Sequence, residues 1–443
     1  MFNEAKDKLF SQMPSIGGMK EHLDQRTRGD KYIWGLVLVL SLISILVVYS
    51  ATGSLAYKMY RGNTSVYLFK QVFFTLIGLI VIFGLHRVNY TFFSRLAIVF
   101  LIFSALLLVY TLAFGAKIND GSRWIKLPII NLTIQSSDVA KLALFMYISK
   151  VLSKKQEVIK DFKKGFLPVI WPVFLICALI MPANLSNALL TGATSLLLMF
   201  IGRVSLKHIG LTILIAMIPV AIIISVAMAT HKSNTNSGQA KPEVAESLKG
   251  FGRFSTWVSR VQDFMYAEKN EVPYQVQQAK IAIANGGILF GLGPGNSRQR
   301  NFLPQAYNDF IYSIIIEEYG LIGGAFIIFI YLVFLFRCIR IFRRCPYAFG
   351  AFLALGLSFT LIIQAVANMA VNVNIVPVTG VTLPLVSMGG SSFIFTCCSI
   401  GLILSVARNV EQVEGKAPEE TEIEIPADST ENENENNVAN ASI

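Results

Sequence analysis

Charged residues are scarce in this chain. Only 15% of its 443 residues are charged, whereas 54% are hydrophobic, and the mean hydropathy is +0.57. A soluble domain carries about 25% charged and about 45–50% apolar residues. The composition therefore excludes a soluble enzyme and predicts a chain that crosses a membrane many times.

Cysteine and histidine are also scarce, and neither forms a pattern with known chemistry. The five cysteines lack the spacing of a zinc site or of a disulfide framework. The four histidines lie far apart, near the ends of apolar segments, which argues against a His-based catalytic or metal site. The glycines at 286–295 lack the Lys-Ser/Thr of a phosphate-binding loop. A carboxylate is therefore the best candidate for acid–base chemistry.

Ten apolar stretches predict an all-α, polytopic membrane protein of about ten transmembrane helices. They cover 32–51, 67–86, 92–114, 132–152, 165–182, 184–202, 207–230, 309–336, 347–372 and 382–407. The first is too long and too poorly flanked for a cleavable signal peptide. A large segment, 231–308, separates the seventh stretch from the eighth, and its aromatic and amphipathic content predicts an ordered loop.

Lysine and arginine gather before the first, after the fourth and after the eighth stretch, which predicts that these segments are cytoplasmic. Both termini are then cytoplasmic, and 231–308 is extracytoplasmic. The predicted domains are a cytoplasmic N-terminal segment (1–31), a ten-helix membrane domain (32–410) and an acidic cytoplasmic tail (411–443). The composition of this tail is typical of disorder.

The net charge of +11 is unevenly distributed. Residues 411–443 hold ten of the 27 acidic residues and one of the 38 basic ones, so the tail carries −9 and the remaining chain +20. Such a membrane domain suits anionic lipid headgroups or a phosphorylated ligand. Basic cytoplasmic loops explain about half of this excess.

Polar residues inside a membrane span are costly and are functional candidates by default. In the fourth span, Gln135, Asp138 and Lys141 recur at three-residue steps, which places them on related faces of a helix. The spacing fits a functional cluster and a self-neutralising Asp138–Lys141 pair about equally well.

The eighth span contains three carboxylates. Asp309 is predicted at the outer membrane boundary, on a helix that carries Glu317 about 12 Å deeper. Spacing alone favours Asp309 as a helix N-terminal carboxylate stabilised by the helix dipole. Glu317 and Glu318 lie too deep for that role, and we predict that they anchor helix packing through charge-paired or backbone contacts.

In the ninth span, Gln364, Asn368 and Asn372 form one polar stripe at i, i+4 and i+8. This stripe either lines a cavity or joins helices by hydrogen bonds. The stretch that follows, 376–392, is interrupted by two prolines and three glycines. A helix so interrupted is tolerated at membrane depth only where protein or water covers its backbone.

Three sets of motifs resemble the FtsW/RodA family of bacterial cell-wall polymerases, and the resemblance covers about residues 31–410. The first set is Gly121-Ser-Arg-Trp-Ile125, Gln135-Ser-Ser-Asp138 and Lys141. The second is Leu303-Pro-Gln-Ala-Tyr-Asn-Asp-Phe-Ile-Tyr312 with Glu317-Glu-Tyr-Gly-Leu-Ile322. The third is Gly380-Val-Thr-Leu-Pro384 with Ser387-Met-Gly-Gly-Ser-Ser392.

The chain departs from the family pattern at a few positions. Ser136 and Asp138 stand where the family has Pro and Glu, and Gln305 and Tyr307 where it has Glu and His. The catalytic aspartate of the family is retained as Asp309. The residues at 295–299 are more similar to the division branch, FtsW, than to the elongation branch, RodA.

The resemblance implies a peptidoglycan glycosyltransferase that polymerises lipid II, an undecaprenyl-pyrophosphate disaccharide-pentapeptide, at the outer face of the bacterial cytoplasmic membrane, in septal cell-wall synthesis. It implies Asp309 as the catalytic residue, acting as a general base or holding a divalent cation, Mg²⁺ or Mn²⁺, at the pyrophosphate. No metal ligands are assigned. The substrate-binding residues that it implies are Arg123, Gln135, Asp138, Lys141, Ser391 and Ser392.

The partners implied are a class B penicillin-binding protein transpeptidase and other divisome or elongasome proteins, and no nucleic acid. The residues leave two other functions open. One is a lipid II flippase, with polar residues of the fourth and ninth spans along its path. The other is a non-catalytic scaffold of the division complex, with the acidic tail recruiting partners.

Overall fold

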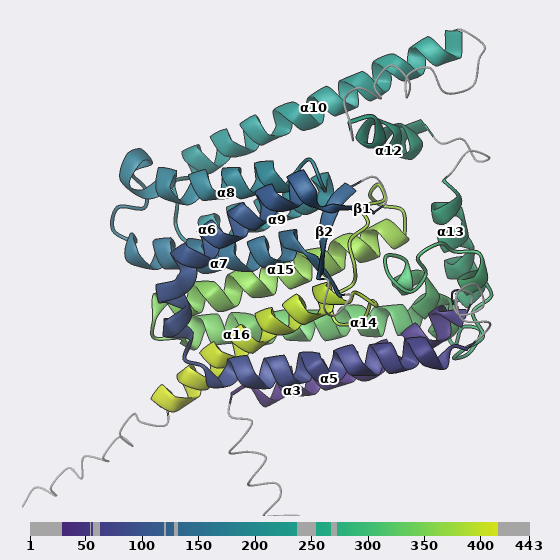
Figure 1. The fold of residues 1–443 in the computed structure, drawn as a ribbon, viewed down its shortest axis with the longest axis horizontal. Helices are drawn as coiled ribbons and strands as arrows, with labels where there is room; N and C mark the ends of the chain where they lie inside the picture. Colours follow the sequence, from purple (N-terminus) through teal and green to yellow (C-terminus); the bar gives the residue numbers. More distant parts are fainter. Residues whose placement is uncertain are drawn as a thin grey trace, which may run out of the picture.

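The computed structural model describes residues 29–53, 55, 63–118, 121–127, 132–236, 254–266 and 273–414. Long helices lie side by side and dominate the described chain (Figure 1). Eight helices among these residues are long and apolar enough to cross a membrane. The predicted all-α, polytopic membrane fold is confirmed. The predicted N-terminal segment up to residue 28 and the tail from residue 415 lie outside the described residues.

A helix lies in each of the ten predicted stretches. These helices are α3 (Lys31–Ala51), α5 (Ser65–Arg87), α6 (Tyr90–Phe114), α7 (Ser136–Lys154), α8 (Leu167–Ile180) after the π-helical turn η1 (Phe162–Phe166), α9 (Leu185–Ile201), α10 (Leu206–Asn236), α14 (Ile311–Arg344), α15 (Ala348–Asn372) and α16 (Ser391–Glu414). The charged residues of α7 and the 17-residue length of α9 keep these two out of the set of eight. The count of ten spans therefore stays a prediction.

Three predicted helix starts were wrong. The fourth stretch begins as a strand and becomes helical only at Ser136, the eighth becomes helical at Ile311, and the tenth at Ser391. Asp309 therefore precedes its helix, and 382–390 is irregular. Hydropathy measures apolarity and cannot separate an apolar strand or a buried loop from a helix.

Other predicted ends were too short. Helix α10 continues to Asn236, so the segment between the seventh and eighth spans starts after residue 236 and not at 231. Helix α14 extends to Arg344, and α16 runs to Glu414, four residues beyond the predicted limit of the membrane domain. Polar and basic last turns continue these helices past the apolar stretch.

A small antiparallel sheet, which the sequence analysis did not predict, precedes α7. It contains β1 (Ala116–Ile118), β2 (Gly121–Leu127) and β3 (Leu132–Gln135) in the order β1-β2-β3. Trp124 pairs with Gln135, and β3 leads directly into α7. The sheet thus brings the two halves of the first motif together.

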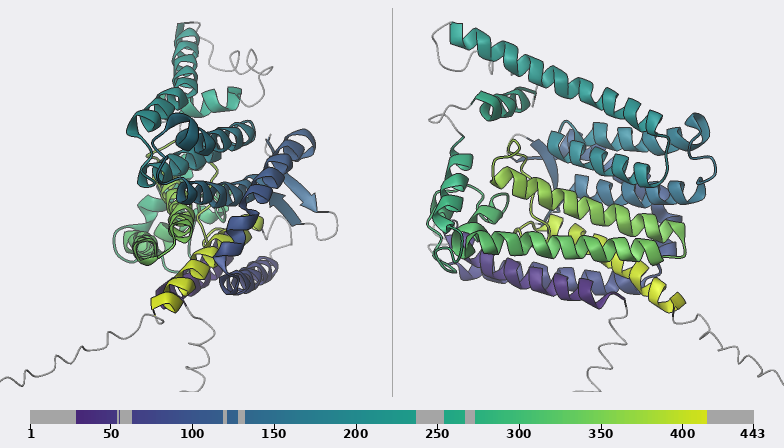
Figure 2. Two further views of the ribbon diagram at one scale, coloured as in Figure 1. Left: turned by 90° about the vertical axis from the view of Figure 1, so that its left-hand side faces the viewer. Right: turned by 180° about the vertical axis from the view of Figure 1, so that it is seen from behind.

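One end of the bundle is rich in basic residues and holds both described ends of the chain. Arg337 forms an ion pair of 2.6 Å with Asp30, and the Gly29 amide donates to Glu411 at 2.6 Å. The loop after α7 adds lysines, and the last turns of α14 add Arg340, Arg343 and Arg344, at this end. Helices α12 (Phe254–Tyr266) and α13 (Tyr274–Gly286) and the sheet lie at the opposite end (Figure 2).

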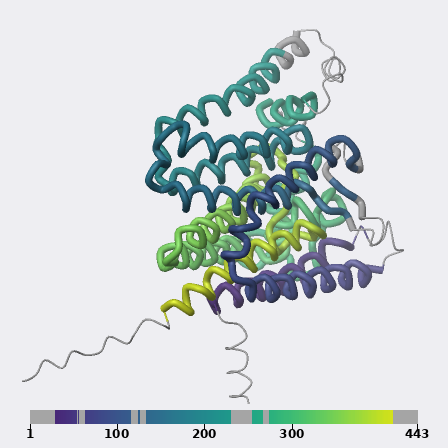
Figure 3. The backbone as a smooth tube through the Cα atoms, turned by 60° about the vertical axis from the view of Figure 1, so that its left-hand side comes forward, coloured from purple at the N-terminus to yellow at the C-terminus, as the bar shows by residue number. Residues whose placement is uncertain are grey.

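Helix α10 diverges from the bundle and contacts α12 (Figure 3). A small apolar cluster of Ile223, Ala227 and Val258 joins the two helices. Because only 11% of its apolar window is buried, most of α10 presents apolar side chains to its surroundings. This exposure is expected of a helix that faces lipid.

Helix α14 is interrupted at Gly320, whose φ is +72°. The interruption leaves two carbonyls and two amides of α14 without helical partners, and the glycine-rich loop 287–293 bonds to all four groups. The Leu292 and Gly293 amides donate to the carbonyls of Glu317 and Glu318, each at 2.9 Å. The Leu321 and Ile322 amides donate to the carbonyls of Gly287 and Ile288, at 3.1 and 3.4 Å. All four freed backbone groups are therefore satisfied.

Glu317 is fully buried and is held by the same loop region. Its carboxylate accepts hydrogen bonds from the Arg298 and Gln299 amides at 3.2 Å and from the Ser297 hydroxyl. The neighbouring Glu318 accepts from the hydroxyl of Ser50 in α3. Glu317 therefore makes the predicted backbone contacts, but with residues 297–299 and not with another spanning helix, whereas Glu318 joins α14 to α3 through the Ser50 hydroxyl.

We predict that Gly291→Ala destabilises the fold more than Gly295→Ala. Both glycines have positive φ, +60° and +76°, so both substitutions strain the backbone. Only at Gly291 does a Cβ meet backbone atoms, 2.4 Å from the Glu318 carbonyl, which adds about 1–3 kcal/mol of overpacking. Apparent melting temperatures of the two variants in detergent test this expectation. Equal melting temperatures would contradict it.

Candidate functional site

Asp309 lies in an irregular segment, 303–310, immediately before α14. This segment is bound to the irregular stretch after α15. The Met388 amide donates to the Tyr307 carbonyl at 3.0 Å, and the Ser387 hydroxyl donates to the Asn308 carbonyl at 2.6 Å. The second and third motifs of the sequence therefore form one structural unit around Asp309.

The amide stripe of α15 fixes the backbone at Asp309. Asn368 and Asn372 donate to the Asp309 carbonyl at 2.8 and 3.0 Å. Asn368 also donates to the Val381 carbonyl at 2.7 Å, and Gln364 donates to the Thr382 carbonyl at 3.0 Å. Hydrogen bonding between segments, one of the two interpretations of this stripe, is confirmed, and Gln364 also lines a cavity.

The Asp309 carboxylate lies next to Gly380, and its charge acts on Arg260. A Cβ built on Gly380 would lie 3.5 Å from Asp309 Oδ2, so the glycine leaves room beside this oxygen. Arg260, on α12, donates to the Val378 carbonyl at 3.0 Å. Burial lowers the pKa of Arg260, and the attraction of Asp309 and Asp263 opposes this change. Arg260 nevertheless stays charged, because a guanidinium does not deprotonate in proteins.

Tyr307 also lies close to Asp309. Burial, and then the Asp309 charge, raise the pKa of this phenol above its ordinary value of 10.0. Tyr307 therefore keeps its proton at physiological pH and remains able to donate a hydrogen bond.

A cavity of about 230 Å³ opens beside Arg260. Its wall includes Asp263 from α12 and Lys280 from α13, with Asn374 and Pro377 from the stretch after α15. Ligand pockets commonly span about 300–1,000 Å³, so this cavity suits part of a larger ligand. Its mixed charge suits a polar or anionic group.

Five of the predicted substrate-binding residues gather in a second place, between α7 and α16. Lys141 and Asp138 form an ion pair of 2.8 Å. The backbone N–H of Gln135 donates to the Ser391 hydroxyl at 3.3 Å. Ser392 lines a small cavity with this ion pair. The self-neutralising Asp138–Lys141 pair is therefore present, within a polar cluster. Asp138 Oδ2 has no hydrogen-bond partner among the described residues.

These five residues, Gln135, Asp138, Lys141, Ser391 and Ser392, form an inner cluster, and the structure separates it from Asp309. Gln364 lines the inner cavity, whereas Asn368 and Asn372, one and two turns further along α15, hold Asp309. Four residues of helix correspond to about 6 Å. The two places are thus successive levels along one helix. Arg123 lies in β2, but its side chain falls outside the described residues.

The residues around Asp309 do not form a ready-made metal site. The described part of the chain contains no cluster of three or more His, Cys, Asp or Glu side chains. A guanidinium faces the Asp309 carboxylate, which disfavours a second cation there. These residues would hold Mg²⁺ or Mn²⁺ only with oxygens that the substrate itself supplies.

The sequence analysis did not identify Arg260 as a site residue. It lies 49 positions before Asp309, and no spacing rule connects the two. The only signal in the sequence was the amphipathic character of its segment, which predicted order but not contact with Asp309.

Comparison with known proteins identifies the family. A family model described as "Cell cycle protein", for FtsW, RodA and SpoVE, matches residues 30–412. The chain belongs to the FtsW/RodA/SpoVE family. The resemblance carried by the three sets of motifs is therefore confirmed over nearly the whole membrane domain.

Family members with curated names are similar over most of their length. A probable peptidoglycan glycosyltransferase FtsW of Nitrosococcus halophilus is 32% identical, covering 90% of this chain and 96% of the relative. Another, of Trichlorobacter lovleyi, is 31% identical, covering 85% of this chain and 92% of the relative. Stage V sporulation protein E of Bacillus subtilis is 31% identical, covering 87% of this chain and 98% of the relative.

Solved structures of the family share the fold. A chain of a peptidoglycan synthase complex that coordinates polymerization and crosslinking is 25% identical, with a TM-score of 0.64, over 87% of this chain and 99% of that one. The rod shape determining protein RodA of Thermus thermophilus is 21% identical, with a TM-score of 0.59, over 86% and 97%. The RodA likeness supports the fold alone.

We predict that Asn368→Leu impairs the site while Ser358→Ala, on the same helix, does not. The first variant removes one of the two donors to the Asp309 carbonyl and a donor to the Val381 carbonyl, and a buried group left unpaired costs about 1–3 kcal/mol. The Ser358 hydroxyl donates to the Leu355 carbonyl, and Ser358 lies ten residues before Asn368, so it is remote from the Asp309 segment. Glycan polymerisation by purified protein measures the effect. Full activity of Asn368→Leu would show that Asp309 does not need this support.

Proposed function

We propose that this protein is a peptidoglycan glycosyltransferase that polymerises lipid II into glycan strands at the extracytoplasmic membrane face. The observation that carries the proposal is a carboxylate, Asp309, whose backbone is held by Asn368 and whose charge acts on Arg260, a residue that lines the 230 Å³ cavity. Relatives named peptidoglycan glycosyltransferase FtsW, similar over nearly their full length, support the same activity.

The depth of Asp309 suits a lipid-linked pyrophosphate. If Arg337, at the basic end of α14, marks one membrane boundary, a hydrocarbon layer of about 30 Å, or about 20 helical residues, ends near Glu317. Asp309 then lies just beyond the hydrocarbon, at headgroup level. A carrier lipid whose tail stays in the bilayer presents its pyrophosphate and first sugar at this level.

The proposed chemistry assigns a distinct task to each neighbouring group. Polymerisation replaces an α-linked pyrophosphate by a β-1,4 bond, so the reaction inverts the donor carbon, which suits a single displacement. Asp309 takes the proton of the acceptor hydroxyl as general base. Arg260 stabilises the charge that develops on the departing pyrophosphate. Gly380 leaves the space beside Asp309 Oδ2 in which the acceptor hydroxyl is placed.

The inner cluster has a supporting role in this proposal. Lys141 is already paired with Asp138, and the cavity beside them is small. These residues, with Gln135, Ser391 and Ser392, bind substrate only if α7 and α16 separate. Arg123, on the strand that precedes them, is the remaining cation proposed for the pyrophosphate.

The basic end of the bundle is proposed to face the cytoplasm of a bacterial cell, with both termini there, and the membrane to be the cytoplasmic membrane. The partners proposed are a class B penicillin-binding protein transpeptidase and other division proteins. The synthase complex to which one structural relative belongs supports such an assembly.

A lipid II flippase is the second candidate, and the polar cluster inside the bundle is the observation in its favour. A non-catalytic scaffold is the third. Reconstituted protein, with and without its transpeptidase, separates the three functions when both polymer and lipid II movement across the vesicle are measured. Lipid II movement without polymer supports the flippase. The absence of both polymer and movement supports the scaffold.

We predict that Asp309→Asn abolishes polymerisation of purified lipid II, because an amide cannot accept the proton. General bases contribute about 10²–10⁴-fold to rate. Asp161→Asn, the same change at an exposed carboxylate of the basic end, should keep the native rate. Thermal unfolding confirms that both variants fold. Retention of activity by folded Asp309→Asn would exclude Asp309 as the base.

We predict that Arg260→Gln lowers the polymerisation rate by about 10²-fold, the loss typical of one group that stabilises developing charge. Arg260→Lys should keep part of the rate, since the positive charge remains. Arg298→Gln is the matched control, because the Arg298 side chain is exposed on the same extracytoplasmic segment. Equal rates for Arg260→Gln and Arg298→Gln would remove Arg260 from the site.

A further inference from the structure

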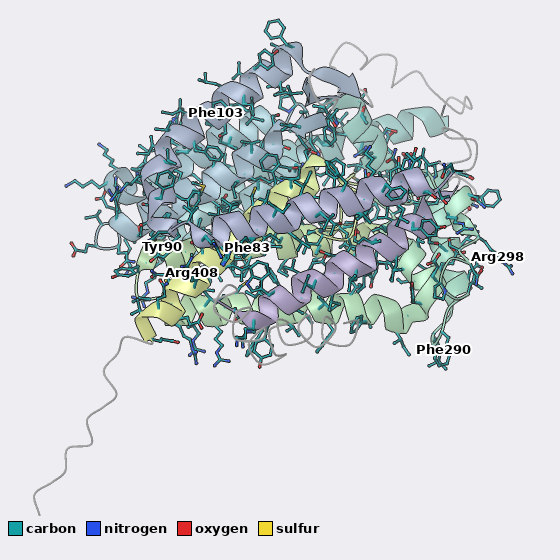
Figure 4. The ribbon with its side chains drawn as sticks, turned by 60° about the horizontal axis from the view of Figure 1, so that its bottom comes forward. Phe83, Tyr90, Phe103, Phe290, Arg298 and Arg408 are labelled. Carbon is teal, nitrogen blue, oxygen red and sulfur yellow. The ribbon has the colours of Figure 1, made fainter. Side chains whose placement is uncertain are left out.

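Three consecutive apolar side chains project from the loop that bonds to α14. Ile288, Leu289 and Phe290 are 74%, 58% and 83% exposed. Figure 4 shows Phe290 at the edge of the molecule, pointing away from the helices. Single exposed apolar residues are ordinary, but three in a row on a loop indicate a contact surface.

The segment around these residues is uncharged. No Asp, Glu, Lys or Arg occurs between Lys280 and Arg298, although the flanking parts of the same extracytoplasmic segment are rich in charges. A loop that lies only in water gains nothing from such a composition. An uncharged, glycine-rich stretch with an apolar tip suits an environment of hydrocarbon or headgroups.

The loop is fastened to a membrane-spanning helix at the level where that helix is itself exposed. Leu321 and Ile322, whose amides donate to the loop carbonyls, are 52% and 53% exposed. Both belong to α14, one of the helices that are long and apolar enough to cross a membrane. The exposed apolar surface of α14 therefore continues into Ile288, Leu289 and Phe290.

The depth along α14 agrees with this placement. With Arg337 at one boundary, the hydrocarbon layer ends near Glu317, and the loop bonds to residues 317–322. The loop thus lies at, or a few ångströms inside, the opposite boundary, whereas interfacial segments bury their apolar faces about 5–10 Å deep.

We propose that residues 287–290 form an interfacial anchor whose side chains insert among the phospholipid acyl chains of the leaflet at the Asp309 end. The occupant is bilayer hydrocarbon, because the anchor is continuous with the lipid-facing surface of α14. The backbone bonds to α14 set the depth of insertion. The glycines on either side permit the close approach that these bonds require, since Gly286 and Gly291 contact the α14 backbone directly.

The anchor has a consequence for the site whichever reaction the protein performs. The chain that leaves the loop donates to the Glu317 carboxylate at Arg298 and Gln299, and then continues to Asp309. The height of Asp309 above the hydrocarbon is therefore set at two points, by α14 and by the lipid contact of the loop.

Fluorescence quenching in nanodiscs tests the anchor independently of any activity. Phe290→Trp is compared with the native protein, and the added emission is measured in lipids brominated near the headgroup or near the chain end. We expect the added emission to be quenched by the shallow bromines more than by the deep ones, and to resist aqueous iodide. The Phe329→Trp variant, on the exposed face of α14, is the lipid-facing control.

Arg298→Trp is the matched control on the same segment, since its side chain is exposed and outside the apolar tip. We expect iodide, but not bromolipid, to quench its added emission. If iodide alone quenches Phe290→Trp, the tip lies in water and the proposal fails. If neither quencher reaches it, protein covers the tip, which equally overturns the lipid contact. Phe290→Trp preserves an aromatic side chain at an exposed position, so folding is retained.

Discussion

Backbone groups at membrane depth must be hydrogen-bonded by protein, and this constraint governs every irregular part of the structure. The chain breaks regular helix at Gly320, in the segment 303–310 before α14 and in the stretch after α15. At Gly320 the loop 287–293 forms hydrogen bonds with four backbone groups of α14. Around Asp309 the side-chain amides of Asn368 and Asn372 do the same. A reactive carboxylate on irregular backbone can therefore exist next to hydrocarbon, because each interruption has a dedicated partner.

Buried acids follow the same logic. Glu317 is enclosed by backbone amides and hydroxyls, and Asp138 is neutralised by Lys141. Burying an ionised group costs a large free energy unless such partners replace its lost hydration. Asp309 differs from both, because its side chain lies next to Gly380 and its charge acts on Arg260, which lines the 230 Å³ cavity.

Much of this arrangement was predictable from the sequence. Hydropathy located ten of the helices, and the i, i+4, i+8 stripe indicated that the amides of α15 line a cavity or join helices by hydrogen bonds. The helix starts near Asp309 and Ser391 were not predictable, since apolar loops and apolar helices have the same composition. The proximity of Arg260 to Asp309 was not predictable either, because it depends on how α12 folds back over the stretch after α15.

The break at Gly320 divides α14 into a short outer piece and a long inner one. A bilayer that is thicker or thinner than the inner piece changes the tilt of a spanning helix. The short piece is fastened to α15, because the Ser313 amide and hydroxyl donate to the Asn372 side chain. The loop 287–293 bonds to both sides of the break, so a change of tilt in the long piece is transmitted to this loop and to the segment that carries Asp309.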